Sequence, residues 1–179
     1  MKRIPLLFTT FFILIYFNCK SQTYVFYAAV PESFLDSTCT KKIRKLTKGE
    51  VMLVENLIPY KKKYLYAHCI KDGKAGFIDK SHIKMEKTYF PDSTGKDPLI
   101  IAKQEYKNPY ARIINTSAHA ILKITFGGKT FILKPDEKEE FYSKPGPLRF
   151  KVETRGYQPL YTNEVFYPFH ITEIDLFIE

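Results

Sequence analysis

The sequence predicts an all-β protein of two small modules, a small N-terminal barrel and a C-terminal antiparallel β-sandwich, joined by a linker with one short helix. Three observations support this fold class. Short segments in which apolar and polar residues alternate fill both halves of the chain, and alternation with period two is typical of half-buried strands. Turn-forming residues separate these segments at intervals of about 8 to 12 residues. A single segment carries the start and stop signals of a helix.

The size and composition of the chain agree with such a fold. It has 179 residues, of which 45% are hydrophobic and 26% charged, as in ordinary globular domains. The formal net charge of +9 would indicate nucleic acid for a cytoplasmic protein. For a protein outside the membrane we expect no nucleic-acid partner. The negatively charged partners expected there are anionic glycans, lipid headgroups or acidic proteins. A solvated strand edge protected by lysines explains the same surplus.

The first residues have the organisation of a secretory signal. Lys2 and Arg3 precede an uncharged apolar run over residues 4–17, which corresponds to the n-region and h-region of such a signal. The run is shorter than the roughly 20 residues that span a bilayer as a helix. We therefore expect residues 1–18 to be a signal peptide and the protein to be exported to the periplasm or the outer membrane.

Cys19 directly follows the apolar run, where bacterial lipoproteins carry the cysteine that is acylated. The stretch "NCKSQ" resembles the looser lipoprotein signals of Bacteroidota. The resemblance implies that Cys19 is lipidated and that residues 19–23 are a short tether to a membrane anchor. Simple cleavage of the signal and an uncleaved anchor are the alternatives.

Two further cysteines, Cys39 and Cys69, form an even pair if Cys19 is lipidated. In an oxidising compartment one disulfide can join them. The alternative is that Cys69 is a buried apolar residue on the strand face of Leu65 and Ala67, with Cys39 free. Both interpretations stay open because the sequence gives no distance between the two Cα atoms.

Residues 24–85 show strand patterns and no helical period. The predicted strands cover residues 23–30, 43–46, 50–58, 64–70 and 74–79. Asp72-Gly73 lies between the last two, and this pair is typical of a two-residue type I′ turn. About five short strands in about 60 residues indicate a small barrel.

The order of residues in this module resembles the bacterial SH3 (SH3b) family. The stretches "KIRKLTKGEVMLVE" and "YLYAHCIKDGKAGFIDKSHI" carry the likeness. The matching positions are Lys48, Gly49, Val51, Val54, Gly73, Lys74, Gly76, Phe77, Ile78 and Ile83. The resemblance implies an SH3-like barrel in which Gly49, Gly73 and Gly76 shape the backbone and Phe77 fills the barrel where relatives have Trp. Domains of this family bind peptidoglycan peptides or other wall components, or position a neighbouring catalytic domain.

Residues 86–109 form the predicted linker. Asp97 suits the N-cap of a helix and Pro98 its first position. Asn108-Pro109 must end that helix, because the residue before proline avoids the α conformation. We expect a helix of about three turns that rests on one of the two modules.

Residues 110–179 return to strand patterns. Gly127-Gly128 between two apolar runs predicts another two-residue hairpin. The segments 148–156 and 171–179 alternate apolar and polar residues, which favours an antiparallel sandwich. This half resembles small β-sandwich domains of secreted Bacteroidota proteins, a likeness that carries no function.

The sequence lacks the patterns of the common catalytic and cofactor sites. A phosphate loop needs glycines that open a helix, whereas strand patterns flank Gly73 and Gly76. The four histidines stand alone, without the spacing of zinc ligands. Glu137, Glu139 and Glu140 follow a turn and are expected to be solvated. We therefore expect no enzyme, no cofactor and no metal.

One stretch stands out as a candidate binding groove. Its residues are Tyr60, Lys61, Lys62, Lys63, Tyr64 and Tyr66. Aromatic faces beside lysines can stack on sugar rings or peptide and pair with carboxylates. The alternative is that Tyr64 and Tyr66 pack against the second module or the linker helix.

These observations predict a non-catalytic binding module of the cell envelope that contacts peptidoglycan or an envelope protein through the barrel. A structural or assembly lipoprotein that binds partner proteins only, with no glycan role, is the alternative.

Overall fold

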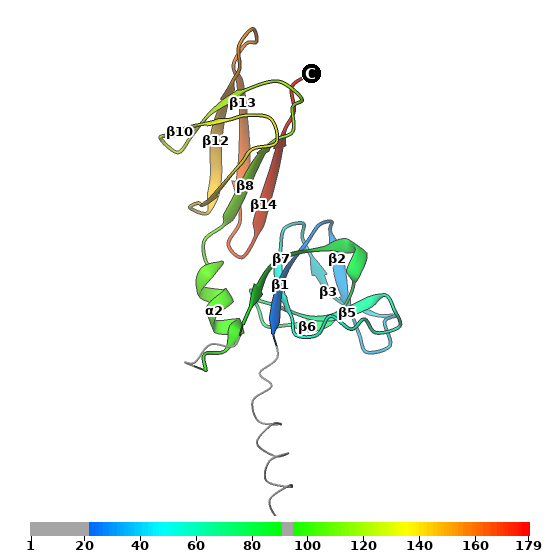
Figure 1. Ribbon diagram of the computed structural model, residues 1–179. Helices are drawn as coiled ribbons and strands as arrows, with labels where there is room; N and C mark the ends of the chain where they lie inside the picture. Colours follow the sequence, from blue (N-terminus) through cyan, green and yellow to red (C-terminus); the bar gives the residue numbers. More distant parts are fainter. Residues whose placement is uncertain (1–21, 91–94) are drawn as a thin grey trace, which may run out of the picture.

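A computed structural model describes residues 22–90 and 95–179, and the described part of the chain is built almost entirely of β-strands (Figure 1). The expected signal peptide, Cys19 and most of the tether lie outside the described residues. The predicted all-β fold with one short α-helix is confirmed.

The N-terminal module is one seven-stranded sheet in the order β3-β2-β6-β5-β4-β1-β7. A 3-10 turn at Lys80–His82 leads from β6 into β7. The strands are β1 (Thr23–Ala28), β2 (Glu32–Leu35), β3 (Lys42–Leu46), β4 (Val51–Val54), β5 (Tyr64–Cys69), β6 (Ala75–Asp79) and β7 (Ile83–Tyr89).

All seven strands contribute side chains to a single core. Phe34 and Leu46 come from one end of the sheet and Ile83 from the other, yet they belong to the same buried cluster. Every member comes from these seven strands and is at most 8% exposed, so the sheet covers its own inner face by curling around it. The other members are Phe26, Ala28, Met52, Val54, Leu65, Ala67, Cys69 and Ile78.

The turn between β5 and β6 differs from the prediction. The N–H of Cys69 donates to the carbonyl of Lys74 at 2.8 Å, and the N–H of Gly73 donates to the carbonyl of Cys69 at 2.8 Å. Four residues, 70–73, therefore form the loop. Gly73 has φ +71° but Asp72 has no positive φ, whereas a type I′ turn needs positive φ at both central residues.

Helix α2 (Pro98–Glu105) starts as predicted, because the Asp97 side chain accepts the N–H of Leu99 at 2.8 Å. Its Ala102 is buried in a second cluster, which also contains Tyr106 just past the helix end. This cluster covers the outer face of β1 and β4, so those two strands are buried on both faces. The helix was expected to rest on one module, but it contacts both, because Glu105 accepts hydrogen bonds from Lys87 and from Tyr142 of the C-terminal module. The strand members are Val25, Tyr27, Val51 and Leu53 of the N-terminal module and Ile171 of the C-terminal module.

The C-terminal module is a sandwich of two sheets, with strand orders β10-β9-β12-β13 and β11-β8-β14. Aromatic side chains fill its core, where the rings of Phe126 and Phe150 stack with centroids 4.3 Å apart. The strands are β8 (Tyr110–Asn115), β9 (Leu122–Phe126), β10 (Lys129–Leu133), β11 (Lys138–Tyr142), β12 (Gly146–Glu153), β13 (Leu160–Phe166) and β14 (Ile171–Leu176).

Two details of the sandwich test the sequence prediction. The Gly127-Gly128 hairpin is present, with φ of +53° and +80° at its two residues. The purely antiparallel arrangement is wrong at one place, because β14 pairs parallel with β8. The long path through β9 to β13 lets the chain re-enter beside β8 in the same direction.

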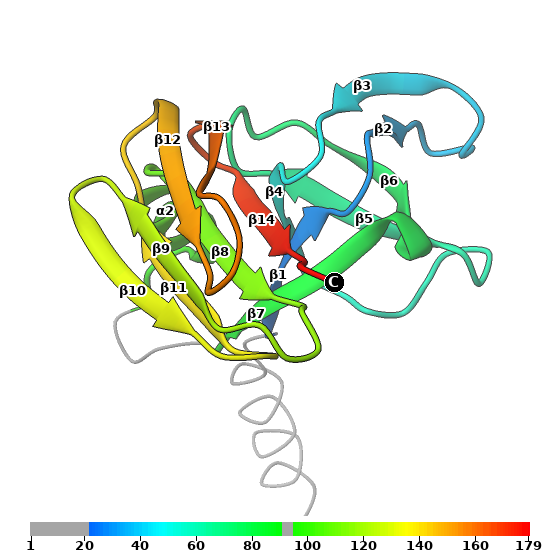
Figure 2. The ribbon, with the colours of Figure 1, turned by 90° about the horizontal axis from the view of Figure 1, so that it is seen from above.

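The turn between β13 and β14 joins the two modules by backbone hydrogen bonds. The N–H of Ile171 donates to the carbonyl of Gly49 at 2.8 Å, and that of Val51 donates to Phe169 at 3.0 Å. A Cβ on Gly49 would lie 2.3 Å from the Ile171 carbonyl oxygen, so the contact requires glycine. Seen from above, β14 lies between β8 and the N-terminal module (Figure 2).

Candidate functional site

The lysine-rich stretch forms a tight hairpin at the surface of the N-terminal module. Tyr60 and Tyr64 exchange two backbone hydrogen bonds, of 2.7 and 2.9 Å. Between them Lys61 and Lys62 have φ of +50° and +61°, a left-handed conformation that costs a side-chain-bearing residue about 1 kcal/mol or more. We call residues 60–64 the lysine hairpin.

Three aromatic rings lie beside the lysine hairpin and form the aromatic cluster, Tyr60, Tyr66 and Phe77. The Phe77 ring is 5.1 Å from that of Tyr60 and 5.2 Å from that of Tyr66, centroid to centroid. Tyr60 and Tyr66 are 44% and 49% exposed. The cluster therefore presents aromatic faces to solvent next to positive charge.

The predicted role of Phe77 as the residue that fills the barrel is wrong. Phe77 lies half-buried on the outer face of β6, opposite Tyr66 of β5. Its neighbours Gly76 and Ile78 are the inward-facing positions, and a side chain one residue away points to the other face. Ile78 fills the core, while a Cβ on Gly76 would lie 2.7 Å from that of Phe34.

The lysines of the hairpin are held to different degrees. The Lys63 ammonium pairs with Asp79 at 2.9 Å. Burial opposes ionisation of Asp79, but hydrogen bonds from Ser81 and the pair with Lys63 outweigh it and lower its pKa to about 2. The Lys61 ammonium lies 5.1 Å from the centre of the Tyr60 ring and donates to the carbonyl of Thr38 at 3.1 Å.

The hairpin and its tyrosines are available to a ligand. Neither Tyr64 nor Tyr66 belongs to the cluster beneath α2, so the alternative in which they pack against the helix or the second module is wrong. Lys62 has no ion-pair partner among residues 22–90 and 95–179. Five of the six predicted groove residues lie in the hairpin, and Tyr66 joins them through Phe77.

The two cysteines are free thiols, and the disulfide between Cys39 and Cys69 is not formed. Cys69 is fully buried in the core of the N-terminal module, and its thiol donates to the Glu50 carboxylate at 3.4 Å. Cys39 lies in the surface turn that precedes β3. Burial and the neighbouring carboxylate raise the pKa of Cys69 to about 12, so this thiol is a poor nucleophile.

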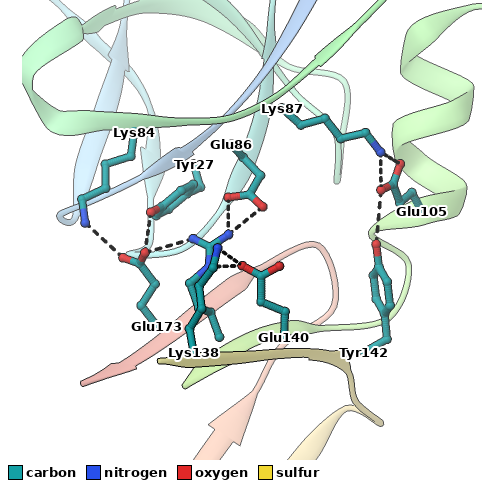
Figure 3. A network of polar contacts seen from close by, with 10 residues as sticks. Tyr27, Lys84, Glu86, Lys87, Glu105, Lys138, Glu140, Tyr142 and Glu173 are labelled. Atoms are coloured by element: carbon teal, nitrogen blue, oxygen red, sulfur yellow. Dashed lines mark hydrogen bonds and ion pairs between the residues drawn. The ribbon is translucent and has the colours of Figure 1, made fainter. Parts of the chain in front are cut away.

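A second polar site, which the sequence did not reveal, lies where the two modules meet. Arg112 of β8 contacts three carboxylates, and these four residues form the Arg112 cluster (Figure 3). The distances from its guanidinium nitrogens are 2.9 Å to Glu86, 2.8 Å to Glu140 and 3.2 Å to Glu173. The hydroxyl of Tyr27 also donates to Glu173, at 2.8 Å.

The strand register explains how this cluster assembles. Arg112 stands directly opposite Glu140 on β11 and beside Glu173 on β14, and Glu86 of β7 completes it from the other module. Glu140 was expected to be solvated, and it is exposed, but its carboxylate also pairs with Arg112, which the sequence did not predict. Hydrogen bonds from Lys138 and Arg112 lower the pKa of Glu140 to about 2. Lys84 also pairs with Glu173 at 3.1 Å and Lys138 with Glu140 at 2.8 Å, so three cations face the three carboxylates and the cluster is a structural joint.

Residues 22–90 and 95–179 contain no group of three or more His, Cys, Asp or Glu side chains placed to hold a metal ion. Among the helices in that part of the chain, none is long and apolar enough to cross a membrane. In comparisons with models of protein families and with curated proteins, the chain matches neither a family model nor a curated protein.

Proposed function

We propose that this protein is a non-catalytic binding module of the cell envelope, with an SH3b-like barrel that contacts peptidoglycan through the lysine hairpin and the aromatic cluster. The observation that carries the proposal is the left-handed backbone at Lys61 and Lys62. Glycine or asparagine suits such positions better. Strained lysines in sequence beside exposed tyrosines indicate that their charge is needed there.

The chemistry of this surface suits a polymer of sugars and acidic peptides. Tyr60 and Tyr66 offer faces on which a sugar ring can stack. Lys62 and the partly held Lys61 and Lys63 offer ammonium groups to carboxylates of a peptide. The carboxylate nearest these lysines, Asp79, is held in an ion pair with Lys63, and the proposed activity is binding without chemistry.

Export and anchoring complete the proposal and rest on the N-terminal sequence. A lipid on Cys19 would hold the module at the membrane and within reach of the wall. Metabolic labelling with a fatty-acid analogue tests this directly. The wild-type chain should be labelled and Cys19→Ala should not, and an unlabelled wild-type chain contradicts lipidation.

Binding to purified sacculi tests the main proposal. The chain from residue 20 onward is suitable, because all three buried clusters are formed by residues from Tyr24 on. We expect retention that falls at least fivefold in the double variant Lys61→Gly, Lys62→Gly. The matched control is Lys103→Ala, Lys107→Ala, which removes two exposed charges away from the hairpin.

If both double variants lose the same share of wild-type retention, only net charge matters for binding. If the wild type is not retained on sacculi, peptidoglycan is excluded as the ligand. A second candidate, docking of an envelope protein with no glycan role, is favoured by Leu57 and Ile58. These residues precede the hairpin and are 42% and 79% exposed. Cross-linking in cells to a defined protein, without sacculus binding, would select this candidate.

A further inference from the structure

We infer that the sandwich holds a binding site for a long-chain carboxylate, in a cleft between the edges of its two sheets. The cleft has a volume of about 460 Å³, within the range of about 300 to 1,000 Å³ that small-molecule sites occupy. It is remote from the lysine hairpin in sequence and belongs to the other module, so it is independent of the proposed wall binding. We call it the edge cleft.

The edge cleft exists because consecutive strands belong to different sheets. β10 is the edge of the four-stranded sheet and β11 the edge of the three-stranded sheet. No ladder joins these two strands, so the core between them is reached from the side. Gly127 of the Gly127-Gly128 hairpin lines the cleft together with residues 142–144, which follow β11.

The interior of the cleft is apolar and aromatic. Phe131, Phe141 and Leu148 line it, and each is half-buried and packs on the sandwich core. The Phe141 ring lies 4.7 Å from that of Phe126 and 6.4 Å from that of Phe131, centroid to centroid. An apolar ligand would cover the exposed part of these core side chains, and removing that apolar surface from water lowers the free energy.

Charge at the opening selects the head of such a ligand. Lys129 and Lys144 line the cleft and are exposed. Glu139 also lines it, and Ser143 adds a hydroxyl. Two ammonium groups against one carboxylate leave a net positive opening, which favours an anionic head group on an apolar chain over a cationic or neutral one.

The test is calorimetric titration with laurate, below its micelle concentration, on the chain from residue 20 onward. We expect one laurate per chain, with dodecanol at least tenfold weaker and dodecyltrimethylammonium without measurable binding. Equal heats from all three probes, or none from laurate, would overturn the inference. Vesicles of phosphatidylcholine separate a free carboxylate from the acyl chain of a lipid, since only the second predicts vesicle binding.

Matched variants place the site. Phe131→Gln should weaken laurate binding at least tenfold, whereas Ile132→Gln, on the opposite face of β10 and 63% exposed, should change it less than twofold. Thermal unfolding of both variants confirms that each is folded. The double variant Lys129→Glu, Lys144→Glu should also lose at least tenfold, against less than twofold for Lys45→Glu, Lys48→Glu.

A second copy of the chain is the competing occupant of the cleft. Sedimentation at several concentrations detects it. A dimer that laurate does not dissociate would assign the edges of β10 and β11 to self-association and overturn the inference. Laurate binding to a monomer, with loss in Phe131→Gln, supports the carboxylate site even if the sacculus experiment fails.

Discussion

The molecule has two clusters of charged side chains, which differ in whether their charges are paired. In the Arg112 cluster each charge faces a partner, and the guanidinium side chain is only 14% exposed. In the lysine hairpin three like charges stand in a row at the surface, and two of them hold a left-handed backbone. The first arrangement lowers the free energy of the fold. The second raises it, which is expected of a group kept for a ligand.

Removing the centre of the Arg112 cluster should have the largest effect. Arg112→Met leaves Glu86 without the cation that it contacts, and leaves Glu140 and Glu173 with only the exposed Lys138 and Lys84. Breaking a buried ion pair costs about 3 to 5 kcal/mol, and the partial exposure of Glu140 places the expected loss near 3 kcal/mol. Urea unfolding measures it. A loss below 1 kcal/mol would show that the cluster is not a joint.

The same variant distinguishes the joint from simple stability. If the cluster holds the modules together, Arg112→Met should unfold in two steps, because each module has its own core. The wild type should unfold in one. A single step in both proteins would mean that the backbone bonds at Gly49 and the cluster beneath α2 suffice.

The pH dependence of stability should follow the carboxylates of the cluster. The pKa of Glu140 is lowered to about 2 in the folded chain, from an ordinary value of 4.5. A depressed acid pKa stabilises the fold above the unfolded value, and that contribution is lost as the pH falls from about 4.5 to about 2. We expect a loss of about 1 to 2 kcal/mol, reduced by solvent screening.

Adjacent glutamates provide the control for this prediction. Glu140→Gln should remove most of the loss between pH 4.5 and 2 in urea titrations. Glu139→Gln, exposed and on the other face of β11, should leave the curve unchanged. Equal curves for the two variants would contradict the assignment of the acid sensitivity to the cluster.

The features that could be predicted from the sequence depend on neighbours along the chain. Asp97-Pro98 and Gly127-Gly128 identify their own conformations, and the alternation in residues 148–156 gives the strand and its buried face. The orientation of Phe77 could also have been predicted. Gly76 and Ile78 occupy inward positions, and side chains alternate along a strand, so Phe77 between them must face outward. The family resemblance drew attention to the wrong face.

The Arg112 cluster could not be predicted, because it depends on pairing between distant strands. Its members come from β7, β8, β11 and β14, and the parallel pairing of β14 with β8 brings Glu173 to Arg112. One signal was present. Arg112 stands between Ala111 and Ile113, both inward-facing and fully buried, so its side chain must lie on the sheet's opposite face. Neighbouring residues in the sequence do not show which distant strands supply the carboxylates on that face.

The smallest expected effect on stability gives the sharpest separation of the two clusters. Lys61→Gly, Lys62→Gly removes two charges and relieves two left-handed residues, at the cost of a more flexible unfolded chain. We expect a net gain of about 1 kcal/mol in urea unfolding together with the loss of sacculus binding. A gain in stability with unchanged binding would remove the reason for the strained lysines. A loss in stability would mean that the lysines support the fold, as Arg112 does, and that the hairpin is a second joint.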